Sequence, residues 1–108
     1  MKKTLPKFKK TETFHPQNEK EQLLVRAFDA LKTEEDIANF LRDILTLPEI
    51  NEFANRLTIA KLLLEGISYL TIAKKIGAST TTVTRVAHWL YNGCGGYQKV
   101  FKSLKSRK

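Results

Sequence analysis

Apolar residues recur along this chain with the spacing i, i+3, i+4, i+7, which places them on one face of an α-helix. The pattern occurs six times, at residues 24–31, 37–44, 50–57, 69–76, 83–90 and 97–104, and Leu64 continues the third stripe. No comparable series of alternating apolar and polar residues, which would indicate β-strands, is present. The sequence therefore predicts an all-α fold of about six short helices.

The predicted helices begin and end at residues that suit helix termini. Thr33 and Thr46 stand three positions before an acidic residue, so each hydroxyl can accept a hydrogen bond from an amide of the first turn. Further signals are Asp36 and Glu49 as those acidic residues, Pro48 in a first turn, Ser68 and Ser79 as N-caps, and Gly93 as a helix stop. The β-branched run 80–84 is the exception, because by itself it resembles a strand.

Residues 69–88, YLTIAKKIGASTTTVTRVAH, have the layout of a helix-turn-helix, and this context favours a helix over the β-branched run. Gly77 falls in the turn, where a positive φ is commonly required. Ala73 is small where the second helix would cross the first. Four apolar residues would pack the two helices together: Ile72, Ile76, Val83 and Val86. The motif is typical of DNA-binding proteins, and it also occurs as a protein contact or as part of a core.

The motif determines which side chains of the second helix face outward. If Val83, Val86, Ala87 and Leu90 face inward, the opposite face carries threonine, arginine and histidine. Arginine can bond guanine O6 and N7, threonine can bond base edges or phosphate, and lysine binds phosphate. The candidate DNA-binding residues are Lys74, Lys75, Ser79, Thr80, Thr81, Thr82, Thr84, Arg85 and His88. The alternative for the threonines is an ordinary solvated helix face.

The net charge of +8 is unevenly distributed over the 108 residues. Residues 1–11 carry +5, residues 12–65 carry −5, and residues 66–108 carry +8 without any acidic residue. This distribution favours a polyanionic partner, nucleic acid first, although surplus lysine also aids solubility. The length suits one core. We expect a basic flexible arm at 1–15, a helical domain at 16–104 with the helix-turn-helix at 69–91, and a basic tail at 105–108.

Residues that would support catalysis or metal binding are scarce. Cys94 is the single cysteine, so an internal disulfide and a cysteine-rich zinc site are excluded. His15 and His88 lie far apart in sequence, and no base partner for a catalytic thiol is evident. No apolar run reaches the ~18 residues of a membrane span. We therefore expect a cytoplasmic protein without membrane contact that is no enzyme and needs no metal or cofactor.

Residues 45–101 resemble the tryptophan-repressor superfamily. The family-like landmarks are Glu65-Gly66, the sequence IGAS at 76–79, and Thr84-Arg85, while NGCGGY at 92–97 is closer to the YerC/YecD branch. The resemblance implies an all-α homodimer with intertwined N-terminal and central helices. It also implies two recognition helices one DNA turn apart, ~34 Å, that read pseudo-palindromic double-stranded DNA. The acidic and apolar segment 16–65 would then build the dimer core.

The resemblance also implies a candidate effector site. In tryptophan repressors, a threonine and two arginines surround the corepressor, and the matching residues here are Thr46, Arg56 and Arg85. Val86 and Trp89 stand where the repressors have glycine and serine, so both add bulk where an indole would lie. These departures argue against tryptophan and leave the effector unidentified. Alternatively, Thr46 is only a cap, Arg56 pairs with an acid, and Trp89 fills the pocket as core.

Two readings of function remain open from the sequence. The first is a dimeric transcriptional regulator, most simply a repressor, that binds duplex DNA through the second helix of its helix-turn-helix. The alternative is a protein-interaction module in which the same motif docks a partner from the transcription or translation machinery. A large exposed apolar patch beside the recognition face would favour the second reading.

Overall fold

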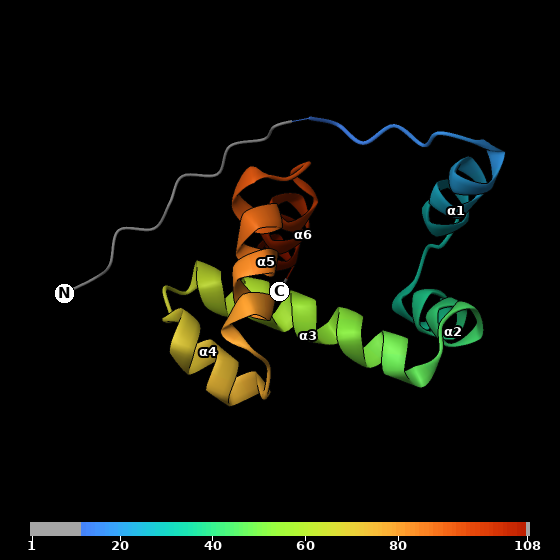
Figure 1. Cartoon of the computed structure of the whole chain (residues 1–108). Coiled ribbons are helices and arrows are strands. Elements are labelled where there is room, and N and C mark those ends of the chain that lie inside the picture. Colours follow the sequence, from blue (N-terminus) through green and yellow to red (C-terminus); the bar gives the residue numbers. More distant parts are fainter. Residues whose placement is uncertain (1–11, 108) are drawn as a thin grey trace. The chain divides into compact units, whose positions relative to one another are not determined.

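Six α-helices and no β-strand lie within residues 12–107, which are the part of the chain described by this computed structural model (Figure 1). The helices are α1 (Glu19–Asp29), α2 (Glu34–Ile44), α3 (Leu47–Leu64), α4 (Tyr69–Ile76), α5 (Thr80–Asn92) and α6 (Gly96–Ser106). They confirm the predicted all-α fold and all six apolar stripes. Two compact units result, the N-terminal unit (Phe14–Phe53) and the C-terminal unit (residues 54–107).

The helix ends of the N-terminal unit follow the predicted capping chemistry. The Thr33 hydroxyl accepts from the Asp36 amide at 3.1 Å. The Glu49 amide donates to the Thr46 hydroxyl at 3.2 Å, and a Glu49 carboxylate oxygen accepts from the Thr46 amide at 2.9 Å. These reciprocal bonds form a capping box at the start of α3. They also hold the pKa of the Glu49 carboxyl below its usual value, because they favour the charged form.

No side chain of the N-terminal unit is buried. The rings of Phe28 in α1 and Phe40 in α2 meet edge to face, with centroids 5.3 Å apart. The apolar stripes nevertheless stay open to solvent. Large apolar side chains exposed in this unit are Phe14, Leu23, Leu24, Val25, Phe28, Ile37, Ile44, Leu47 and Phe53. The predicted amphipathic faces are therefore present but have nothing to cover them within the unit.

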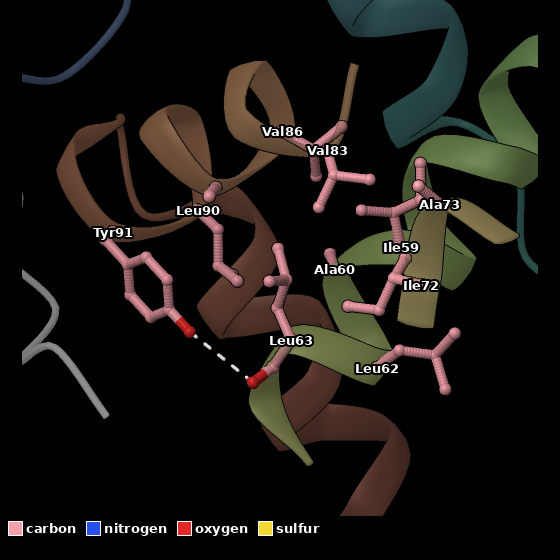
Figure 2. Close-up of a cluster of buried hydrophobic side chains, with 11 residues drawn as sticks. Ile59, Ala60, Leu62, Leu63, Ile72, Ala73, Val83, Val86, Leu90 and Tyr91 are labelled. Atoms are coloured by element: carbon pink, nitrogen blue, oxygen red, sulfur yellow. Dashed lines mark hydrogen bonds between the residues drawn. The ribbon is translucent and has the colours of Figure 1, made fainter. Parts of the chain in front are cut away.

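The buried core lies in the C-terminal unit, where the second half of α3 meets α4 and α5 (Figure 2). Ile59, Ile72, Val83 and Leu90 are its largest fully buried side chains. The complete core consists of Ile59, Ala60, Leu62, Leu63, Ile72, Ala73, Val83, Val86, Ala87, Leu90 and Tyr91. From α6, Tyr97 and Phe101 pack against it. The Tyr91 hydroxyl donates to the Leu63 carbonyl at 3.5 Å, and burial raises the pKa of this phenol.

The β-branched run that resembles a strand lies in the first turns of α5. Burial of Val83 in the core and capping by Ser79 outweigh the weak local helix preference, which is the tertiary override expected from the motif. The predicted domain limits stay predictions. Residues 1–11 of the predicted arm lie outside the described residues, and α6 continues through Ser106 into the predicted tail. None of the helices is long and apolar enough to cross a membrane, within residues 12–107.

Candidate nucleic-acid interface

The turn between α4 and α5 is built around Gly77. This residue caps the C-terminus of α4 in the left-handed conformation, with φ 77° and ψ 32°, which confirms the predicted positive φ. The amides of Gly77 and Ala78 both donate to the Ala73 carbonyl at 2.9 Å. Ser79 then caps α5 by accepting from the Thr82 amide at 3.2 Å. Three residues thus end one helix and start the next, which defines a helix-turn-helix.

The rotation of α5 about its own axis follows from its buried residues. Val83, Val86, Ala87 and Leu90 are all buried, as predicted, and Tyr91 joins them. Tyr91 is a buried member that the spacing argument omitted. Because the core contains this face of α5, the opposite face is directed to solvent. The structure places all nine candidate DNA-binding residues on the exposed surface: Lys74, Lys75, Ser79, Thr80, Thr81, Thr82, Thr84, Arg85 and His88.

The hydroxyl groups of that surface differ in what they can still bond. The Ser79 and Thr82 hydroxyls lie 3.1 Å apart and share a hydrogen bond within the cap. The Thr84 hydroxyl donates to the Thr80 carbonyl at 2.9 Å, so its proton is used inside the helix. The side-chain hydrogen bonds of this segment, within residues 12–107, do not involve the Thr81 hydroxyl. Ser79 and Thr82 thus stabilise the start of the helix, while Thr81 keeps both donor and acceptor capacity.

Positive charge and free amides gather at the junction of α4 and α5. Lys74 and Lys75 stand in the last turn of α4, where cations also suit the helix dipole. Ser79 satisfies the Thr82 amide, which leaves the amides of Thr80 and Thr81 for an outside acceptor. A helix N-terminus of this kind suits phosphate. Glu65 is the single acidic residue between positions 54 and 107.

Trp89 does not have the position that one sequence-based alternative gave it, in which its side chain fills a pocket as part of the core. It is 53% exposed, and its ring meets that of His88 edge to face with centroids 5.4 Å apart. The interpretation as core was wrong, because Trp89 lies about 60° around the helix beyond Val86, at the edge of the buried face of α5. Trp89 instead borders an apolar hollow of roughly 350 Å³ that Leu57, Cys94, Gly96, Tyr97 and Val100 also line.

Gly93 ends α5, as predicted, but for a steric reason and not a conformational one. Its φ of −91° is open to any residue. A Cβ at this position would collide with the backbone carbonyl of Trp89 and press on its ring. The side chain of Gln98 then ties α6 to the end of α5, since its amide donates to the Leu90 carbonyl at 3.2 Å. The spacing of apolar residues does not predict this hydrogen bond.

The Trp repressor protein family model matches residues 19–105 of the chain. The chain belongs to the Trp repressor family. "Uncharacterized protein YerC" of Bacillus subtilis (strain 168) is 37% identical over 76 residues, which make up 70% of this chain and 73% of that protein. A crystal structure of a TrpR-like protein from Eubacterium eligens ATCC 27750 has a TM-score of 0.76 and 36% identity. This match covers 85% of the present chain and 95% of the other.

These relatives confirm the resemblance seen in the sequence, including its YerC-like branch. The Trp repressor family consists of DNA-binding regulators, so the expectation of a protein without enzymatic activity is confirmed by the family membership. In the described part of the chain, no three His, Cys, Asp or Glu side chains are grouped as metal ligands would be.

The candidate effector residues of the Trp repressor family occupy separate settings. Thr46 belongs to the N-terminal unit, where it completes the capping box of α3. Arg56 and Arg85 are exposed residues of the C-terminal unit. Burial raises the pKa of Tyr97, and the nearby Arg56 guanidinium opposes that rise. Val86 is only 5% exposed, so its side chain is part of the core. The effector site stays a prediction.

Sequence reasoning missed the first helix cap. The Asn18 side chain accepts from the Glu21 amide at 2.9 Å, and the Glu21 carboxylate accepts from the Gln17 amide at 2.9 Å. The signal was available, because Asn18 and Glu21 have the same three-residue spacing as the predicted capping box.

Proposed function

We propose that this protein is a transcriptional repressor that binds pseudo-palindromic duplex DNA as a homodimer, through the exposed face of α5, in the cytoplasm. The observation that carries the proposal is the orientation of α5. Its apolar face is buried in the core, and its opposite face presents hydroxyl, guanidinium and imidazole groups beside two lysines and free amides.

The residues of this face divide by what they can recognise. Arg85 can make two hydrogen bonds to guanine, and the Thr81 hydroxyl can donate to or accept from a base edge. Thr84 has used its proton on the Thr80 carbonyl, so it offers lone pairs and a methyl group, which suit an amino group or a thymine methyl. Lys74 and Lys75 neutralise phosphates and position the protein without reading sequence.

Exposed apolar surface in the N-terminal unit supports the homodimer. Leu23 remains 69% exposed, and no side chain between Phe14 and Phe53 is buried. Apolar area contributes ~25 cal/mol per Å² when it is removed from water, so these stripes gain most by covering one another in a second copy. The two-fold symmetry of such a dimer would be matched by pseudo-palindromic DNA.

The alternative of a protein-docking module would need an apolar recognition face. Within α5 the one large apolar side chain that is exposed is Trp89, beyond the polar surface at the helix start. The surface is therefore suited to a polar and charged partner.

The proposal names no effector, since Val86 is packed in the core and tryptophan is disfavoured. A thermal-shift screen of amino acids tests whether an effector binds, because a ligand at 100 times its Kd adds ~2.7 kcal/mol to the stability of the folded protein.

Selection from randomised duplexes tests the proposed function. The full chain should retain duplexes that share one motif with two related half-sites, and retention should fall as salt rises. Absence of any shared motif would contradict the proposal. A stoichiometric protein partner recovered after nuclease treatment would favour the docking module instead.

Analytical ultracentrifugation tests the dimer. The wild-type chain should sediment as two copies. Leu24→Lys, which puts a charge in the apolar stripe of α1, should shift it toward one copy. The matched control is Leu70→Lys on α4, where the leucine is also exposed but lies in the C-terminal unit. Equal behaviour of the two variants would place the interface elsewhere.

A further inference from the structure

The last helix, α6, carries a cluster of positive charge that lies outside the recognition helix α5. Lys99, Lys102 and Lys105 are exposed on α6, which contains no acidic residue. Their spacing of three residues spreads them over about 120° of the helix circumference. Tyr97 and Phe101 lie on the adjoining side of the helix, with Phe101 one turn before Lys105, and pack against the core. The three lysines form the lysine face of α6.

Packing orients this face. Because Tyr97 and Phe101 are held by the core and Gln98 is bonded to the end of α5, the first half of α6 is anchored to the C-terminal unit, and the helix continues to Ser106. The lysine face is therefore a helical surface, and Lys105 of the predicted basic tail lies within the helix.

The charges around the lysine face are mostly of the same sign. Lys102 and Lys105 also border a hollow beside α3 in which Lys61 adds a positive charge and Glu65 a negative one. The face thus has a net attraction for anions. Lys99 and Lys105 are separated by ~9 Å along the helix axis, a length over which duplex DNA carries about five phosphates.

We propose that the lysine face of α6 is a second DNA-binding surface, which holds the duplex through its phosphates and does not read sequence. The inference rests on the proposed function in that it takes the partner to be duplex DNA. A membrane is the less favoured partner, because a surface-bound helix inserts its apolar face into the lipid. In α6, Tyr97 and Phe101 of that face pack against the core, which leaves Val100 and Leu104 as its exposed large apolar side chains.

The test compares two triple variants at the same positions. One carries Lys99→Gln, Lys102→Gln and Lys105→Gln, and the other carries arginine at these three sites. Binding to a random-sequence duplex and to a selected duplex is measured between 50 and 200 mM salt. Loss of three phosphate contacts reduces the magnitude of the slope of log K against log salt by about 2.7 for each bound chain. For each chain in the complex, the wild type should therefore lose ~40-fold more affinity over this range than the glutamine variant. The arginine variant should keep the wild-type slope.

A charge-matched control separates local contact from net charge. Lys20→Gln, Arg26→Gln and Lys32→Gln remove the same charge from exposed positions in the N-terminal unit. In samples that sediment like the wild type, which shows that association is intact, they should leave the slope unchanged. Circular dichroism confirms that each variant is folded.

The possible outcomes distinguish the inference from the proposed function. A glutamine variant with the wild-type slope would overturn the inference even if sequence-selective binding persists. A reduced slope on random duplexes, without any preferred sequence, would support the inference and contradict the proposed function. Flotation with phosphatidylserine vesicles that depends on the three lysines, together with an unchanged DNA slope, would overturn the inference in favour of a membrane.

Discussion

Substitution of Gly77 tests the conformational basis of the helix-turn-helix. Its φ of 77° lies in the left-handed region, and no atom is within 4 Å of the place where a Cβ would stand. Gly77→Ala should therefore act through backbone conformation and not through a clash. The left-handed conformation costs a residue with a Cβ ~1–2 kcal/mol, while loss of freedom in the unfolded chain returns ~0.4–1 kcal/mol. The expected net loss is about 1 kcal/mol.

Urea denaturation at fixed protein concentration measures this loss. With a slope of ~1–3 kcal/mol per M, the midpoint should fall by about 0.5 M. The urea midpoint of Gly77→Asn should fall less, because asparagine tolerates the left-handed region. At Gly93 the two substitutions should be equally harmful, because a Cβ of either residue would collide with the Trp89 carbonyl. If Gly77→Ala leaves the midpoint unchanged, or if asparagine is no better than alanine at Gly77, the conformational reasoning is wrong.

Three further outcomes are expected. Thr81→Ala should relax base preference in duplex selection while Lys74→Gln weakens all duplexes alike, and Thr58→Ala, on the exposed surface of α3, should change neither. Folding lowers the pKa of the Glu49 carboxyl. The charged carboxylate therefore stabilises the folded state above the ordinary pKa of 4.5, and this stabilisation is lost as pH falls through the folded pKa. Glu49→Gln should flatten the acid side of a plot of unfolding free energy against pH. Folding raises the pKa of the Tyr91 phenol. The protonated phenol therefore contributes fully to the unfolding free energy below the ordinary pKa of 10, and this contribution is lost as pH rises through the folded pKa. Tyr91→Phe should reduce the alkaline loss of stability in the same titration.

Local chemistry was predictable where a short sequence pattern determines a structure. The capping box of Thr46, the N-caps Ser68 and Ser79, and the left-handed Gly77 all depend on residues within a few positions of one another. Spacing likewise predicted the buried face of α5, because a helix of known period exposes one side when the other is apolar.

Contacts between distant segments were not predictable from the sequence. Tyr91 is buried because its hydroxyl reaches Leu63, 28 positions earlier in the chain. Trp89 is exposed although it is the largest apolar residue of α5, because Leu90 beside it fills the core position. The hydroxyls of the proposed recognition face posed a third difficulty. Composition treats all four threonines of residues 80–84 alike, and only the structure shows that the hydroxyls of Thr82 and Thr84 bond locally at the start of the helix.

The uncovered apolar stripes of the N-terminal unit have a consequence for gene control. For the proposed homodimer, the DNA-binding species forms from two chains, so at low abundance its amount rises with the square of the chain concentration. A twofold change in synthesis would then change the amount of that species about fourfold, and the same association would stabilise the fold. The bare faces of α1 and α2 would thus make operator occupancy steep in protein dosage, without any ligand.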